Sequence, residues 1–349
     1  MNYRIVVIGE SWHGSDCTGL ARGFRELGHA VELIGADQFF PKTNRSVSSR
    51  LLSRAIRPFY VHQFNSHILQ QVSIIKPNIA VVFKGNYVQT HTLKNIKEGG
   101  AWLSNFYPDI SFFAHRVVAK EGWLIYNHIF TTKKHGAEEM MEQLGLENVS
   151  FLQHGFDGDV HRLMPTTMAV STNLQCDISF IGGWSPNKEK HLCDLVSACY
   201  DLDLRIWGDR WQNSRCQNLQ ATIQGNPIYG DYYALAIGAS KINLGLLQDQ
   251  QGFAKIGDRV TSRTFHIPAS GGFLLHERTE EVLDYFEEGK EIACFGSSKE
   301  LIEKVRYYLT NEKERLQIAK AGYERCLTEN SLVNRAQVII DKYESETNK

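Results

Sequence analysis

The sequence predicts an α/β fold made of two doubly wound, parallel-sheet domains that face each other across a cleft. A strand–loop–helix–strand unit opens the chain, and the same alternation continues to about residue 144. It pauses at residues 154–165, which are rich in Gly, Asp and Pro, and then starts again. Such alternation favours parallel sheets with helices on both faces. We therefore expect domains at residues 1–158 and 159–330, and a C-terminal helix in residues 331–349 whose expected partner is the first domain.

The first domain begins with an apolar run, Ile5–Ile8, which is typical of a strand buried on both faces. The helix after it is expected to end at Gly28, a common helix stop. The basic stretch at residues 42–57 is interpreted as a solvated, partly helical connection, with contact to an anionic surface as the alternative. We expect strands at residues 4–8, 30–34, 78–83, 101–105 and 125–130, and helices at residues 15–27, 61–75, 90–97 and 136–144.

The second domain shows the same alternation. We expect strands at residues 178–181, 204–207, 241–246 and 272–275 and helices at residues 188–199, 232–239, 279–286, 298–309, 312–326 and 332–343. A short helical segment precedes Gly271 and Gly272, because Pro268 fits only near the first turn of a helix or at a break. Ligands of open α/β sheets bind beyond the carboxyl ends of the strands, so a site in the cleft between the domains is expected.

Composition excludes several classes of protein. The formal net charge is -1, which argues against a nucleic-acid partner held by bulk electrostatics. The seven cysteines are scattered and form no CxxC pair, which argues against a disulfide framework and a zinc site and favours buried thiols in a reducing cytosol. No window approaches the roughly 20 apolar residues that span a bilayer. We therefore expect a cytoplasmic protein without a membrane span.

A glycine-rich loop marks the strongest candidate site. Gly182 and Gly183 follow a strand, and Lys188 stands at the start of the next helix. Backbone N–H groups at a helix start together with a lysine can bind a diphosphate. The spacing is not that of the Walker motif, and a sharp turn with a surface lysine is the alternative. The loop after the first strand lacks GxGxxG, so a simple NAD domain is poorly supported.

Five further residues are candidates. Arg263 and His266 lie on one face of a helical turn, where the arginine can bind phosphate and the histidine a hydroxyl, although a structural ion pair is the alternative. Tyr229 lies between elements and could hold a planar base. His13 and Asp109 each follow a strand of the first domain, where either could act as a general base. A loop histidine packed beside a tryptophan and an ordinary turn aspartate are the respective alternatives.

Longer segments resemble the CgeB-like glycosyltransferases, whose C-terminal half is a "glycosyl transferases group 1" domain of the GT-B fold. The resemblance rests on SRTFHIPASGGFLLHERTEEVLDYFEEGKEI and RYYLTNEKERLQIAKAGYERC, and on FKGNYV, NFYPD, VSFLQHGFD, DISFIGGWSPNKE and IYGDYYALAIGASKINLGLL upstream. It covers nearly the whole chain. It implies two Rossmann-like domains, a nucleotide-sugar donor bound mainly by the second domain, an acceptor approached from the first, and no essential metal or other cofactor.

The resemblance also implies roles for residues. Gly182, Gly183 and Lys188 match the loop that binds the donor phosphates, although related retaining enzymes often have Arg where this chain has Gly183, so Arg263 is expected to supply the missing cation. Tyr229 falls where the nucleobase is held. Asp258 and His266 occupy the two positions of a Glu-x7-Glu pattern whose second Glu contacts ribose, and His266 puts that contact in doubt. His154, in the HGFD motif, is implied to face the cleft, and Asp109 and His13 match acceptor-side positions.

The sequence thus predicts a glycosyltransferase of the hexosyltransferase type that uses a nucleoside-diphosphate sugar, with UDP as the expected nucleotide. Retention of the anomeric configuration requires no protein nucleophile, whereas inversion would use Asp109 or His13 as the general base. Two alternatives remain: a nucleotide-sugar epimerase or hydrolase on the same architecture, and a non-catalytic nucleotide-sugar-binding protein. The acceptor is not identified.

Overall fold

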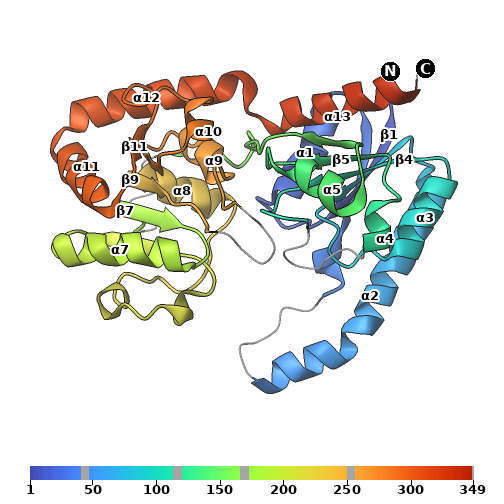
Figure 1. The fold of residues 1–349 in the computed structure, drawn as a ribbon, viewed down its shortest axis with the longest axis horizontal. Helices are drawn as coiled ribbons and strands as arrows, with labels where there is room; N and C mark the ends of the chain where they lie inside the picture. Colours follow the sequence, from blue (N-terminus) through green and yellow to red (C-terminus); the bar gives the residue numbers. More distant parts are fainter. Residues whose placement is uncertain (41–46, 113–119, 166–172, 250–255, 348–349) are drawn as a thin grey trace. The chain divides into compact units, whose positions relative to one another are not determined.

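The computed structural model describes residues 1–40, 47–112, 120–165, 173–249 and 256–347 (Figure 1). The chain divides into two compact units. The first comprises the described residues of Met1–His154 together with Leu332–Lys349, and the second comprises the described residues between Gly155 and Ser331. The division falls between His154 and Gly155, four residues before the expected boundary at 158/159.

The first unit contains a parallel sheet of six strands in the order β2-β1-β3-β4-β5-β6. Side chains of β1 alternate between two apolar cores, with Ile5 and Val7 on one face and Val6 and Ile8 on the other. The sheet is therefore buried on both faces, as the apolar run predicted. Its strands are β1 (Arg4–Gly9), β2 (Ala30–Gly35), β3 (Ile79–Phe83), β4 (Trp102–Tyr107), β5 (His128–Thr131) and β6 (Val149–Phe151).

The helices of this unit are α1 (Asp16–Glu26), α2 (Val47–Ile75), α3 (Thr90–Glu98), α4 (Lys120–Trp123), α5 (Gly136–Leu144) and α13 (Leu332–Thr347), with a 3-10 turn at Ala36–Gln38. The C-terminal helix α13 packs on α1 so closely that a Cβ on Gly23 would lie 2.8 Å from the carbonyl oxygen of Leu332. The Tyr3 hydroxyl donates to Glu344 at 2.7 Å and the Trp102 indole donates to Glu346 at 2.8 Å. These contacts attach the end of the chain to the first unit.

Helix α2 differs from the expectation. The helix expected at residues 61–75 begins earlier, at Val47, and continues through Pro58 to Ile75, so the described part of the basic stretch is helical. Proline removes one backbone donor, and here the helix continues past it. The Arg57 side chain lies over the Tyr87 ring, 4.9 Å from its centroid, and donates to the Tyr87 hydroxyl at 2.9 Å. The part of the basic stretch at residues 42–46 lies outside the described residues.

The second unit contains a parallel sheet of five strands in the order β11-β10-β9-β7-β8. Its strands are β7 (Cys176–Ile181), β8 (Leu204–Trp207), β9 (Ser240–Gly245), β10 (Leu274–Glu277) and β11 (Ala293–Phe295). Its helices are α7 (Pro186–Ala198), α8 (Asp231–Ala239), α9 (Arg263–Ala269), α10 (Glu280–Leu283), α11 (Ser298–Thr310) and α12 (Glu312–Glu329), and 3-10 turns lie at Trp211–Asn213 and Gln217–Leu219. Strand order reverses between β7 and β9, which is where ligands of such sheets bind.

The cysteines require a correction. The prediction of seven free thiols is wrong, because Cys193 on α7 and Cys216 in the loop after β8 form a disulfide with a Cα–Cα distance of 6.1 Å. The pair is 23 residues apart, and no spacing motif marks it in the sequence. The remaining five cysteines are free and buried, as expected for small apolar side chains.

Candidate functional site

Four of the residues predicted for the donor site come together at the carboxyl edge of the second sheet. Gly182 and Gly183 follow β7, and Lys188 lies in the first turn of α7. Arg263 begins α9, and its Nη2 donates at 2.8 Å to the carbonyl of Leu246, the residue that follows β9. The four residues therefore lie at the reversal of strand order between β7 and β9, the expected position for a ligand.

Close packing requires glycine at positions 182 and 208. A Cβ on Gly182 would lie 3.0 Å from Nη1 of Arg263 and 2.9 Å from the ring of Phe180. The next loop approaches the same turn, since a Cβ on Gly208 would lie 2.0 Å from the Gly182 carbonyl oxygen. Glycine at these positions lets the Arg263 guanidinium and the loop after β8 contact the turn directly.

Lys188 is a buried cation beside other cations. Its side chain is buried, and its ammonium donates to the Gly183 carbonyl at 3.2 Å. Burial, followed by the positive charge of Arg263 and then more weakly that of Arg210, lowers the pKa of Lys188 to about 7. Asp258 opposes this shift. A buried ammonium with this environment favours binding of an anion, because an anion would remove the repulsion among the cations.

Arg263 is held between an aromatic ring and a carbonyl. Its guanidinium lies over Phe180, 5.5 Å from the ring centroid. Burial lowers the pKa of Arg263 from its ordinary value. Its Nε is buried and has no hydrogen-bond partner among the described residues, and the same holds for the Ser185 hydroxyl at the N-cap of α7. Two unsatisfied donors at one anion-attracting turn point to a ligand that accepts hydrogen bonds.

The start of α7 carries a carboxylate that the sequence did not predict. The Asn187 N–H donates to Oδ2 of Asp249 at 3.0 Å, so this N–H is not free for a phosphate. The Asn187 side chain donates to Glu277 at 3.2 Å, and the same carboxylate accepts from Leu247 N–H at 2.9 Å. Asp249 therefore binds where the helix N-terminus favours an anion.

The other donor-side candidates differ in position. Asp258 lies close enough to Lys188 and Arg263 to raise the pKa of each, and its N–H donates to the Gln248 carbonyl at 2.9 Å. Tyr229 is half exposed in the loop before α8. Asp258 is thus an acidic neighbour of Lys188 and Arg263, and Tyr229 lies in the loop that leads into α8.

His266 is part of a buried aromatic stack. Its ring is 3.7 Å from that of His161 at an interplanar angle of 16°, and Tyr233 meets both rings edge-on. Its Nε2 lies 3.1 Å from the Gly155 carbonyl oxygen and must donate to it. His161 accepts at Nδ1 from Asp157 N–H at 3.1 Å, and burial followed by the charge of His266 lowers its pKa well below the ordinary value. This arrangement gives His266 a structural partner.

The three candidates of the first unit lie in separate environments. Asp109, after β4, forms an ion pair of 2.7 Å with Lys84, which follows β3 and was not predicted as a site residue. His13 is exposed in the loop after β1. His154 is buried, and its carbonyl accepts from Nη2 of Arg335 at 3.0 Å. His13 and Lys84 follow β1 and β3, between which the strand order of this sheet reverses.

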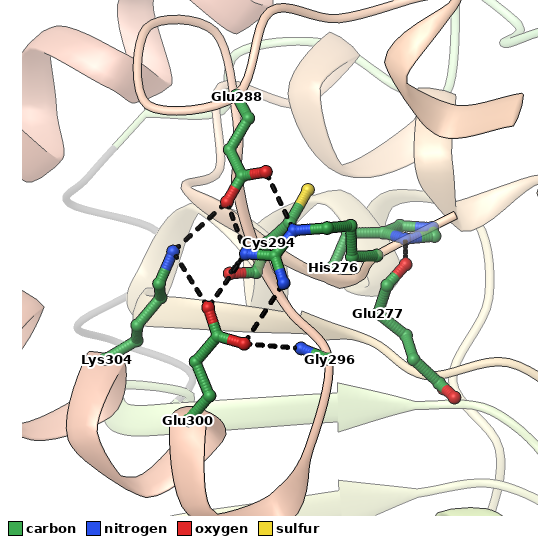
Figure 2. Close-up of polar contacts among 8 residues, drawn as sticks. His276, Glu277, Glu288, Cys294, Gly296, Glu300 and Lys304 are labelled. Carbon is green, nitrogen blue, oxygen red and sulfur yellow. Dashed lines mark hydrogen bonds and ion pairs between the residues drawn. The ribbon is translucent and has the colours of Figure 1, made fainter. Parts of the chain in front are cut away.

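An ion-pair network missed by the sequence analysis stands at the end of β10 (Figure 2). Arg278 donates to Glu288 at 2.7 and 2.9 Å and to Glu300 at 2.8 and 3.1 Å. Lys304 pairs with both carboxylates. Arg278, ahead of the other contributions, lowers the pKa of Glu300 to about 2. The Glu277 carboxylate points away from this network and contacts the start of α7.

Three further features concern the described part of the chain. A cavity of about 550 Å³ lies at the amino-terminal edge of the first sheet, lined by Arg4, Lys76, Lys97 and Trp102 among others, away from the predicted residues. No group of three His, Cys, Asp or Glu among the described residues could hold a metal ion. No described helix is both long and apolar enough to cross a membrane.

Comparisons with known proteins agree with this architecture. Residues 188–341 match the family model described as "Glycosyl transferase-like". No curated protein matches the chain. Three solved structures are similar over nearly their whole length: sucrose-phosphate synthase from Thermosynechococcus elongatus (10% identity, TM-score 0.64, 99% of each chain), Anabaena Alr3699/HepE in complex with UDP-glucose (10%, 0.64, 99% of this chain and 100% of that one), and a Listeria monocytogenes protein described as a UDP-N-acetylglucosamine 2-epimerase (11%, 0.59, 100% and 97%). The chain has the GT-B fold of two Rossmann-like domains.

Proposed function

We propose that the chain is a glycosyltransferase that moves a sugar from a UDP-linked donor to an acceptor hydroxyl. The observation that carries the proposal is the buried Lys188 ammonium between Arg263 and the Gly183 carbonyl, with unsatisfied donors around it. A diphosphate supplies the negative charge that this cluster favours. The match to a glycosyl transferase-like family model and the UDP-glucose complex of a structure with the same fold support the same donor class.

Sugar transfer is promoted by cations that stabilise the departing diphosphate. The bond between the anomeric carbon and the phosphate oxygen breaks, and a bond to the acceptor oxygen forms. The departing diphosphate gains negative charge, which Lys188 and Arg263 offset more strongly in the transition state than before it. Because protein cations meet this charge, we propose that the reaction needs no metal.

The face from which the acceptor hydroxyl attacks the anomeric carbon sets the stereochemistry, and it also decides which group accepts the hydroxyl proton. If a donor phosphate oxygen accepts it, the sugar keeps its anomeric configuration and no protein base is needed. If Asp109 or His13 accepts it, the configuration inverts. Lys84 would then position Asp109 through their 2.7 Å ion pair. We favour retention, in line with the group-1 resemblance, and keep His154 as a candidate acceptor-side contact.

The test is turnover of the purified full chain with UDP-glucose. UDP release, slow with water and faster with an accepted hydroxyl compound, is the expected result, and Lys188→Ala should abolish it. Asp109→Asn and His13→Gln together separate the two stereochemical routes: an inverting enzyme loses about 10²–10⁴-fold in rate in one of the two variants, whereas a retaining one keeps most of its rate in both. Tight binding of UDP-glucose without any UDP release would leave a non-catalytic binding protein.

A second candidate, a UDP-sugar 2-epimerase, is favoured by the similar fold of the Listeria monocytogenes structure described as such. Proton NMR of UDP-N-acetylglucosamine incubated with the chain distinguishes the two reactions. Appearance of an epimer, free or UDP-linked, supports the epimerase. UDP release with an unchanged sugar ring supports the transferase.

A further inference from the structure

We propose that Arg210 is a third diphosphate-binding cation of this site, supplied by the loop after β8. This proposal rests on the proposed function, because it assigns a contact to the same donor. Neither the strand pattern nor the motifs marked Arg210, which precedes the 3-10 turn at Trp211–Asn213. Its assignment depends on three-dimensional contacts that link residues far apart in the chain.

The Arg210 guanidinium lies beside Gly183. A Cβ placed on Gly183 would lie 3.5 Å from Nη2 of Arg210 and 4.0 Å from its Nε. The Arg210 group therefore lies where a side chain at position 183 would project. Arg263 occupies the corresponding space beside Gly182 at 3.0 Å. Two guanidinium groups thus flank two consecutive glycines, and Lys188 donates to the second of them.

The Arg210 guanidinium is available to bind a ligand. Arg210 is exposed, and its guanidinium has no hydrogen bond or ion pair among the described residues. It differs in this respect from Arg278, which is engaged by two carboxylates. A guanidinium offers five donors in a planar fork that matches phosphate oxygens. The Arg210 group can therefore bind an anion at the glycine turn without breaking an existing contact.

The backbone at Arg210 has a left-handed conformation. Its φ is +67°, a left-handed conformation that costs free energy for any residue but glycine. The loop is held there by both sides of the turn: the Trp211 indole donates to the Gly182 carbonyl at 2.9 Å, and Trp184 N–H donates to the Asp209 carbonyl at 2.9 Å. These bonds fix Arg210 directly beside the turn that binds the phosphates.

The loop that carries Arg210 is attached to helix α7, which also carries Lys188. The Glu189 carboxylate accepts from Arg215 N–H at 2.6 Å, Cys216 N–H at 2.9 Å and the Ser214 hydroxyl at 3.1 Å. The disulfide from Cys193 closes the same attachment. The loop and the helix therefore form one unit, so Arg210 and Lys188 keep a fixed relation to each other.

Electrostatics connects the two residues. The positive charge of Arg210 lowers the pKa of Lys188, in the same direction as Arg263. An anion between them removes this repulsion, whereas the loss of Arg210 reduces it in the free protein. Removal of Arg210 therefore has a signature that simple damage to the loop would lack: the pH above which an anion stops binding moves upward.

The experiment compares Arg210→Gly and Arg210→Lys with the wild type, and uses Arg215→Ala as a matched control from the same loop. Arg215 is exposed and contacts Glu189 only through its backbone, so its side chain is dispensable. UDP-glucose and inorganic diphosphate are titrated calorimetrically from pH 6 to pH 9. Arg210→Gly should weaken both ligands roughly 10–100-fold, as expected for lost charge-assisted hydrogen bonds. Arg210→Lys should restore part of the loss, and Arg215→Ala should match the wild type.

The choice of glycine at position 210 guards against a loss of binding that is caused by misfolding. Because Arg210 has a positive φ, Arg210→Gly relieves backbone strain and should melt no lower than the wild type. Weaker binding by this variant, with the upward pH shift, supports the proposal. Wild-type affinity in Arg210→Gly, or an equal loss in Arg215→Ala, overturns it while the donor assignment stands. A wild-type protein that binds neither ligand overturns the proposed function and this inference together.

Discussion

The guanidinium of Arg263 lies so close to Gly182 that a Cβ on the glycine would come within 3.0 Å of Nη1. This contact joins two segments that are far apart in the chain, the loop after β7 and the start of α9. It places a fixed cation against the backbone turn to which the Lys188 ammonium also donates. The positive charges of Arg263 and Lys188 therefore repel each other. The proposed donor site therefore depends on the folded sheet edge, and its charges determine how it should respond to pH and substitution.

Donor binding should take up a proton above neutral pH. Lys188 has a pKa of about 7 in the free protein and should be fully charged beside a diphosphate. At pH 8 the binding of UDP-glucose should then take up most of a proton per site, and affinity should fall as the pH rises above the pKa of Lys188, by up to roughly tenfold per pH unit. Calorimetry in two buffers of different ionisation enthalpy measures the uptake. Lys188→Met should show none, and uptake by that variant would contradict the assignment.

The same lysine should lower the stability of the free protein. The pKa of Lys188 in the folded chain lies below its ordinary 10.5, so the penalty for burying the ammonium is complete below pH 7 and disappears as pH rises toward 10.5. Lys188→Met should therefore be more stable than the wild type by on the order of 1–3 kcal/mol at pH 7. Urea denaturation at pH 7 and pH 10 tests this: the difference should shrink at the higher pH, and a difference that grows would be the opposite sign.

Asp249 should compete with the donor. Its carboxylate accepts the Asn187 N–H at 3.0 Å, at the helix start that favours an anion, and it also raises the pKa of Lys188. Asp249→Asn removes this negative charge, so UDP-glucose should bind several-fold more tightly at low salt. Asp194→Asn, a change of equal charge later on the same helix, serves as the control. Weaker binding by Asp249→Asn would show that the carboxylate supports the donor instead.

The disulfide should be detectable by counting thiols. The unfolded, unreduced chain should react at five cysteines and the reduced chain at seven. Replacement of both Cys193 and Cys216 by Ala should lower the free energy of unfolding by about 3 kcal/mol, because the bond closes a loop of 23 residues. A dithiol reductant should lower the stability of the wild type and leave the double variant unchanged. Seven reactive thiols without reductant would mean that the bond does not form.

His266 should tolerate glutamine and resist glutamate. Its Nε2 donates to the Gly155 carbonyl, and a glutamine amide can replace this donor. A glutamate, the residue implied at this position by the resemblance, would place a carboxylate against the carbonyl oxygen. His266→Glu should therefore destabilise the chain by about 1–3 kcal/mol, and His266→Gln by less. Urea midpoints at pH 7 decide the matter, and an equal or higher midpoint for His266→Glu would restore the ribose assignment.

Much of the fold was predictable because its signals are local. The apolar run Ile5–Ile8 marks a strand buried on both faces, and the helix at Gly136–Leu144 has the expected bounds. Strands β6 and β11 were missed because each has only three residues. The start of α2 was misplaced because a basic stretch followed by Pro58 resembles a connection. Short or atypical segments depend on their neighbours for structure, and their own sequence carries little of that signal.

The site was predictable only in part. Gly182, Gly183 and Lys188 lie in one loop and the helix after it, so a phosphate-binding role could be proposed for them from the sequence. Arg210 and Asp249 reach the same turn through the pairing of β7 with β8 and β9. Cys216 reaches Cys193 by the same route. Contacts of this kind depend on strand order, which no local pattern in the chain specifies.

A crystal structure of the full chain with UDP-glucose tests the central claim most directly. The account predicts diphosphate oxygens within about 3 Å of the Lys188 ammonium and the Arg263 guanidinium, at the turn formed by Gly182 and Gly183. A nucleotide bound elsewhere, with these two cations unengaged, would contradict it.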